Sequence, residues 1–233
     1  MLLSTFMENL KKYKHDQVFN PWSSYDDTCD ISSDAPHIRS CQLEEYIMRR
    51  INRAKYLFIA EAAGYQGCRF TGIALTCERM LLNKHKQITS TMILGHTGRR
   101  TSHPDCPLMT SLPQHRDGMN EPTDTYIWGS IIDNDLSPEE VLLWNIFPFH
   151  PHKNSSFTNR TPTEEELMDG LRYTHQLLHM CPPNITIGTI GKKAFTTLKQ
   201  AGFDVSLMRH PANGGAGKFR QQFTEWIGQN RHD

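Results

Sequence analysis

Four apolar segments, most of them followed by a loop and a helical pattern, set the strongest limit on how this chain folds. An apolar run that does not alternate with polar residues is typical of a strand buried on both faces, and such strands pair in parallel when helices connect them. We therefore predict an α/β fold, a three-layer α/β/α sandwich around a central, mostly parallel four-stranded sheet. The predicted strands lie within residues 54–64, 141–149, 184–190 and 204–208.

Length and charge narrow the class of protein. The chain has 233 residues and a formal net charge of zero. The length suits one domain over residues 1–233, and the zero net charge excludes a strong overall field that would attract nucleic acid. No apolar run approaches the roughly 18 residues of a membrane span, and residues 1–16 lack the order of a signal peptide and predict an amphipathic helix. We expect a cytoplasmic protein that does not bind a membrane.

The cysteine pattern argues against a metal centre. No two cysteines have the C-x-x-C spacing that zinc and iron–sulfur sites commonly use, and His150 and His152 form only a lone His-x-His pair. We therefore expect no metal, no iron–sulfur cluster and no cofactor. Without an export signal, reduced thiols are expected. The six cysteines are Cys29, Cys41, Cys68, Cys77, Cys106 and Cys181.

Polar residues stand at or near the ends of three predicted strands. Glu61 ends the first strand, Asn145 lies inside the second, and His210 follows the fourth. Because ligands of an open parallel sheet bind beyond the carboxyl ends of its strands, we expect these three side chains to converge on one site. Each also has a plainer interpretation: Glu61 as a turn cap, Asn145 as a partner for neighbouring backbone, and His210 as an ordinary residue at a strand end.

The segment "RHPANGGAGK" (209–218) follows the fourth strand and is poor in side chains. Its glycines leave backbone amides open to an anion, so the segment suits a phosphate beside His210, although glycines also serve as loop filler. Lys192 follows the third strand at a predicted helix start, another position suited to an anion. Residues 95–125 show no periodicity and predict a surface excursion or lid.

Four motifs together resemble the uracil-DNA glycosylase superfamily, and the likeness extends from residues 18–22 to the last helix. "AEAAGYQGCRFTG" is similar to the first motif of that family, and "LLWN" to the strand whose asparagine reads the base. "NRTPTEEEL" is similar to a segment of the thermophile-type branch, and "RHPANGG" to the His-Pro motif that grips a flipped nucleotide. The resemblance implies an uracil-DNA glycosylase-like fold and a DNA N-glycosylase that leaves an abasic site.

The resemblance also assigns roles to residues. It implies that Asn145 pairs with the extruded base, that His210 stabilises negative charge on the departing base, and that Glu61 positions or activates water, or holds the pocket. DNA is the expected partner, and relatives of this kind are monomers. The candidate substrate-binding residues are Ala62, Ala63, Gly64, Tyr65, Gln66, Arg69, Phe70, Leu75 and Asn213, of which Gln66, Arg69 and Asn213 are chosen by loop position alone. The candidate DNA-binding residues are Arg160, Lys192, Gly214, Gly215 and Lys218, the two lysines because they lie beside strand-end loops.

Several positions depart from the family pattern. The family's aspartate that activates water falls near Ala62, and Ala74-Leu75 stand where relatives have a proline and a phenylalanine that stacks on uracil. Losing the aromatic platform enlarges the pocket, and Phe70 is a candidate replacement. This favours a bulky modified pyrimidine, such as the glucosylated hydroxymethylcytosine of phage DNA in an anti-phage defence. The alternatives are uracil in base-excision repair and an inactive DNA-binding module.

Overall fold

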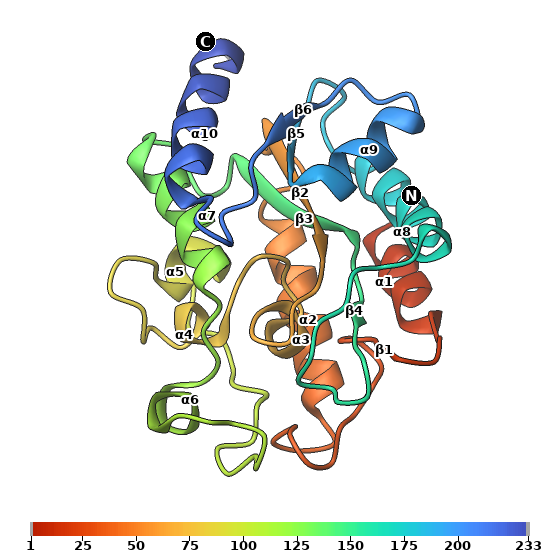
Figure 1. Ribbon diagram of the computed structural model, residues 1–233, viewed down its shortest axis with the longest axis vertical. Helices are drawn as coiled ribbons and strands as arrows, with labels where there is room; N and C mark the ends of the chain where they lie inside the picture. Colours follow the sequence, from red (N-terminus) through yellow and green to blue (C-terminus); the bar gives the residue numbers. More distant parts are fainter. Residues whose placement is uncertain (1, 232–233) are drawn as a thin grey trace.

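The computed structural model describes residues 2–231 and confirms the predicted fold class (Figure 1). A fully parallel four-stranded sheet has the order β3-β2-β5-β6. The strands are shorter than predicted at one or both ends, where proline or polar residues flank the apolar runs. Their bounds are β2 (Tyr56–Ala62), β3 (Val141–Phe147), β5 (Thr186–Ile190) and β6 (Ser206–Met208).

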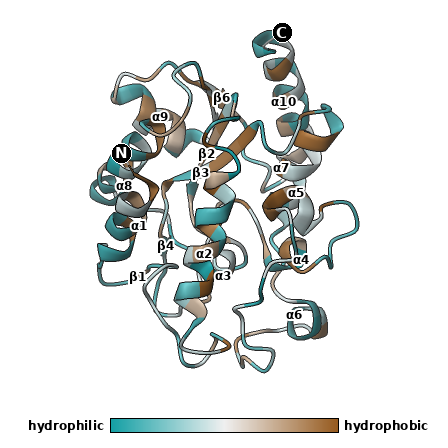
Figure 2. Ribbon diagram, turned by 180° about the vertical axis from the view of Figure 1, so that it is seen from behind, coloured by the Kyte–Doolittle hydropathy of each residue, from teal (hydrophilic) through white to brown (hydrophobic). Residues whose placement is uncertain are grey.

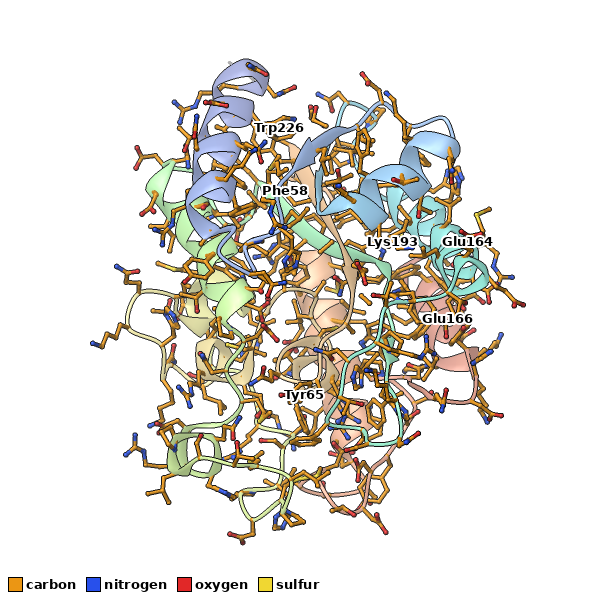
Figure 3. The ribbon with its side chains drawn as sticks, viewed as in Figure 1. Phe58, Tyr65, Glu164, Glu166, Lys193 and Trp226 are labelled. Carbon is orange, nitrogen blue, oxygen red and sulfur yellow. A yellow bond between two sulfur atoms is a disulfide. The ribbon has the colours of Figure 1, made fainter. Side chains whose placement is uncertain are left out.

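Helices cover both faces of the sheet. Tyr56 and Phe58 of β2 pack against Trp226 of α10, with ring centroids 5.8 Å and 5.2 Å apart, as the labelled Phe58 and Trp226 in Figure 3 show. Successive side chains of a strand point to opposite faces, so the residues between them face the other helical layer. That layer contains α1 (Leu3–Lys12), α8 (Glu164–Leu178) and α9 (Lys192–Gln200), whereas α7 (Pro122–Asp133) and α10 (Ala216–Asn230) lie on the first face (Figure 1).

The hydropathy of the segments follows this layering. In Figure 2 the central strand β2 is mostly hydrophobic, whereas much of α8 and the helix α6 (Leu112–Asp117) are hydrophilic.

The hydrogen-bonding edge of β3 is covered rather than open to solvent. The Tyr46 hydroxyl of α2 (Ala35–Met48) accepts from the Leu143 N–H at 2.8 Å, and Arg50 Nε donates to the Val141 carbonyl at 3.0 Å. Covering an edge strand prevents it from pairing with another chain.

The connection from β2 to β3 is long and is built from short helices. Residues 95–125, the segment predicted as a surface excursion or lid, are held in place by hydrogen bonds to Glu78, which is 1% exposed. Its carboxylate accepts hydrogen bonds from the backbone N–H groups of Thr101, Ser102 and Met119 at 2.9–3.0 Å and from the Ser102 hydroxyl. The remaining helices of this connection are α3 (Cys68–Thr71), α4 (Glu78–Leu81) and α5 (Ser90–Leu94).

One prediction about the cysteines is wrong. Cys29 and Cys106 form a disulfide, so the expectation of reduced thiols fails for this pair. The two residues are fully buried in a small cluster with Phe70, Met109 and Met119. The fold brings together residues that lie 77 positions apart, which spacing alone does not reveal. The other four cysteines are free.

A two-stranded antiparallel sheet completes the architecture. It pairs β1 (Val18–Phe19) with β4 (His150–Pro151) and holds the loop after β3 against the N-terminal part of the chain. Between residues 2 and 231, no helix combines the length and apolar character that a membrane crossing requires.

Candidate active site

A cavity of about 140 Å³, here called the inner cavity, lies at the carboxyl end of β2 and β3. Parallel pairing places Ala60 of β2 opposite Asn145 of β3, so the predicted Glu61 lies one position beyond this pair, at the same end of the sheet. Glu61, Asn145 and His210, the three predicted catalytic residues, all line this cavity. Its full lining is Ala60, Glu61, Ala62, Gly64, Gly67, Cys68, Leu75, Glu121, Thr123, Asp124, Asn145, Asn159 and His210.

Asn145 has the features of a ligand-binding amide. It is 1% exposed, and its Oδ1 has no hydrogen-bond partner in the described part of the chain. A buried polar atom without a partner costs free energy, so such atoms are rare and commonly serve a function. An amide side chain can read the donor and acceptor pattern of a heterocycle's edge. The plainer interpretation, in which the amide is satisfied by neighbouring backbone, does not account for the free Oδ1.

Glu61 is half-buried at the mouth of the inner cavity. Burial raises the pKa of its carboxyl, while a hydrogen bond from Thr161 and the charge of Lys193 act to lower it. Lys193 lies in the first turn of α9. Figure 3 shows it on the same side of the molecule as Glu164, the first residue of α8. The net effect is a carboxyl whose pKa is raised by burial, with the charge of Lys193 offsetting part of the rise.

The loop after β6 determines the state of His210. The Ala212 N–H donates to His210 Nδ1 at 3.2 Å, so in the neutral ring the proton is on Nε2. Burial lowers the pKa of His210, and the charge of Arg209 lowers it further. A neutral imidazole with a fixed Nε2–H is a donor that needs no rearrangement before it stabilises a developing anion.

Two glycines of this loop are required, Gly215 by close packing and Gly214 by its backbone conformation. A Cβ on Gly215 would lie 2.1 Å from the His210 carbonyl oxygen, so any larger residue would displace the histidine. Gly214 has φ +74°, in the left-handed region that favours glycine. Gly214, Gly215 and the exposed Asn213 lie outside the lining of the inner cavity.

A second, larger cavity of about 710 Å³, here called the outer cavity, adjoins the first. Its lining is strongly basic: Lys192, Lys193, Arg209 and Lys218 all contribute, so two of the residues predicted to bind DNA lie in it. Gly191 and Lys192 stand at the N-terminus of α9, where backbone N–H groups favour an anion. The other lining residues are Glu61, Leu207, Met208, His210 and Gln222.

Several predicted residues lie elsewhere. Arg69 is fully buried, pairs with Asp26 at 2.5 Å and packs on aromatic rings, and Phe70 belongs to the cluster around the disulfide. Neither contributes to the inner cavity, so Phe70 does not replace the missing aromatic platform. Arg160 makes a bidentate ion pair with Glu166, both contacts being 2.6 Å. Ala63, Tyr65 and Gln66 also lie outside the lining, whereas Ala62, Gly64 and Leu75 contribute to it.

The inner cavity also contains acids that the sequence analysis missed. Glu121 and Asp124 come from the end of the 95–125 segment and the first turn of α7, and burial raises the pKa of both carboxyls. Asn159, from the loop after β4, is a third addition, and its Oδ1 accepts from the Tyr65 N–H at 3.1 Å. The sequence did contain a signal for Glu121 and Asp124: they are two acids three positions apart, beside Pro122, at the start of a helix.

The acids do not make a metal centre. Among the residues that the structure describes, no group of three or more histidine, cysteine, aspartate or glutamate side chains is arranged to hold a metal ion. His150, half of the His-x-His pair, is buried, and its Nε2 bonds to the Thr158 carbonyl.

Comparison with known proteins identifies the family of this chain. The family model described as the uracil DNA glycosylase superfamily matches residues 52–228. Among solved structures, the fold is similar to SMUG2 of Pedobacter heparinus, with a TM-score of 0.59, 14% sequence identity and coverage of 98% of each chain. A search of curated proteins finds no match. Because the family model spans well over half of the chain, this protein belongs to the uracil DNA glycosylase superfamily and is a DNA glycosylase.

Proposed function

We propose that this DNA glycosylase extrudes a pyrimidine nucleotide, encloses its base in the inner cavity and holds the adjacent phosphates in the outer cavity. One observation carries the proposal: Glu61 and His210 line both cavities, and no other residue of the two linings is shared. The bond between base and sugar of an extruded nucleotide has to cross this junction. The two residues are thus in place to act on the glycosidic bond.

The chemistry of each group fits its place. When the bond between C1′ and the base nitrogen breaks, the electron pair stays on the base and the sugar becomes cationic. His210 Nε2–H donates to the base carbonyl that gains negative charge, and Asn145 holds the base by its edge. The Glu61 carboxylate stabilises the cationic sugar and orients the water whose oxygen bonds to C1′. The proton of that water neutralises the departing base.

The volume of the inner cavity favours a base without a bulky substituent. A cavity of about 150 Å³ in another protein holds one benzene ring, so 140 Å³ matches a single pyrimidine ring. Uracil is the simplest such substrate. A glucosylated hydroxymethylcytosine, acted on in defence against phage, is the second candidate, because Leu75 lines the cavity in place of an aromatic residue and the larger outer cavity opens beside it.

The test is abasic-site formation on defined substrates. A uracil duplex is compared with phage DNA that carries glucosylated hydroxymethylcytosine and with DNA of a mutant phage that carries plain cytosine. We expect cleavage of the uracil duplex, reduced about 10²-fold or more in Asn145→Ala and His210→Ala, as when a donor to a developing oxyanion is removed. Asn52→Ala, an exposed asparagine, is the matched control and should retain activity.

The other outcomes separate the alternatives. Cleavage of the glucosylated DNA alone would establish the second candidate and a defence role. Binding of every duplex without any abasic site would identify a catalytically inactive DNA-binding module and contradict the proposal.

A further inference from the structure

Asp124 is the buried acid in the inner cavity that the proposed mechanism leaves unused. It lies in the first turn of α7, is 2% exposed and lines the cavity together with Asn145. Its Oδ2 finds no hydrogen-bond partner among residues 2–231. Two residues that line one small cavity, Asn145 and Asp124, therefore each carry a buried polar atom without a partner. Buried polar atoms of this kind indicate a ligand that completes their hydrogen bonds.

The surroundings of Asp124 disfavour a negative charge on it. A Cβ on Gly67 would lie 2.9 Å from Asp124 Oδ2, so the loop after β2 packs closely against the carboxyl. Burial, followed by the charge of Glu121, raises the pKa of Asp124 well above the ordinary aspartate value. The neighbouring thiols of Cys68 and Cys77 are buried as well, and burial raises their pKa values, that of Cys77 to about 12. These surroundings favour the neutral carboxylic acid form of Asp124.

We propose that Asp124 is a second base-reading residue, which donates a hydrogen bond from its carboxylic acid to a carbonyl oxygen of the extruded pyrimidine. This inference rests on the proposed function, since it names the class of base that the inner cavity selects. Asn145 Oδ1 supplies an acceptor and Asp124 a donor, a pair that complements the N3–H and the carbonyl of uracil. Cytosine presents a ring acceptor and an amino donor there, which is the opposite pattern.

The same hydrogen bond strengthens during the reaction. As the glycosidic bond breaks, negative charge spreads over the carbonyl oxygens of the base, and a hydrogen bond to a charged acceptor is stronger than one to a neutral acceptor. Asp124 thereby lowers the barrier as well as selecting the base. Ionisation of Asp124 removes the donor and places a second negative charge beside the departing anion, so the activity declines as pH rises through the pKa of this carboxyl.

The experiment measures kcat/KM on a uracil duplex between pH 5 and 10 for wild type, Asp124→Asn and Asp124→Ala. We expect Asp124→Ala to lose about 10²-fold at neutral pH. Asp124→Asn keeps a donor in place, so it loses less and lacks the alkaline decline of the wild type. Glu61, Glu121 and His210 also face the cavity and titrate, but all three are unchanged in Asp124→Asn, so a decline that disappears in this variant belongs to Asp124. Asp133→Asn, exposed on the same helix, is the matched control.

Two further readouts do not depend on cleavage. Affinity for a duplex with the slowly hydrolysed 2′-fluoro analogue of deoxyuridine should fall in Asp124→Ala more than in Asp124→Asn. The melting temperature of Asp124→Asn should exceed that of the wild type by an increasing margin as pH rises from 4, because a raised folded-state pKa means that the wild type loses stability over that interval.

The outcomes distinguish this inference from the proposed function. A wild-type protein that binds the analogue without cleaving any DNA contradicts the proposed function, yet the affinities of the variants still test Asp124. An Asp124→Ala variant with wild-type affinity and activity, or the same alkaline decline in Asp124→Asn as in the wild type, overturns the role of Asp124. Absence of both binding and cleavage in the wild type overturns both.

Discussion

At the scale of single residues, the reactive state of His210 is fixed by its neighbours. The Ala212 N–H bonds to Nδ1, and protonation of that nitrogen would break the bond and turn the ring. Activity therefore requires the neutral form and is lost as pH falls through the pKa of His210, which burial and Arg209 hold below its usual value. Replacing Arg209 with alanine removes one of the two causes, so the acid limb of the kcat profile should move to higher pH.

This prediction is checked under saturating DNA, because Arg209 also lines the outer cavity and its loss weakens binding. Arg172→Ala removes an exposed arginine on α8 and serves as the control. An acid limb that stays in place in Arg209→Ala would contradict the role given to the neutral ring.

Residue prediction succeeded where the order of elements alone decides which side chains meet. Glu61, Asn145 and His210 were predicted because strand ends of a parallel sheet converge, a rule that needs only the order of elements. Arg69 was misplaced because its partner, Asp26, lies 43 positions away. Arg160 stays a predicted DNA contact, but the nearby Glu166 accepts hydrogen bonds from both of its terminal guanidinium nitrogens. Arginines beside a site need a check for such carboxylates before they are assigned to DNA.

At the scale of elements, one buried acid holds the segment that completes the site. Glu78 accepts from three backbone N–H groups, and Glu78→Ala leaves them buried without partners, each costing about 1–3 kcal/mol. We expect a loss of about 3 kcal/mol or more in the free energy of unfolding, measured by urea denaturation. Abasic-site formation should fall as well, because the segment ends at Glu121 in the cavity lining.

The control for this prediction is Glu8→Ala, an exposed glutamate on α1 that should change stability little. Equal stability of Glu78→Ala and wild type would show that the segment is held by other contacts, such as the Cys29–Cys106 disulfide.

The elements themselves were predictable to different degrees. The four strands and the capping box of α8 have local signals: apolar runs, and a threonine three positions before a glutamate. The 95–125 segment has no such local signal, because it is held by Glu78, which lies outside the segment, and by the disulfide between Cys106 and Cys29. Non-local anchors of this kind leave no periodic trace in the sequence, and for that reason Glu121 and Asp124 were missed.

At the scale of the whole molecule, a formal net charge of zero conceals an uneven distribution of charge. The sequence predicted Lys192 and Lys218 as DNA contacts from their places beside strand-end loops, and the fold adds Lys193 and Arg209 to the same basic cavity. A protein without net charge is not drawn to DNA by its overall field. Its affinity for DNA should therefore depend on this one patch.

Salt dependence measures how many phosphates the patch contacts. For duplex DNA, the slope of log affinity against log salt is about −0.9 per neutralised phosphate. Lys192→Ala and Lys218→Ala should each make the slope shallower by roughly 0.9 if each lysine meets one phosphate, as read by fluorescence anisotropy with the 2′-fluoro duplex. Lys12→Ala, exposed on α1 in the opposite helical layer, should leave the slope unchanged. Equal slopes in all four proteins would mean that the DNA backbone follows another face, and the junction at Glu61 and His210 would lose its connection to the phosphates.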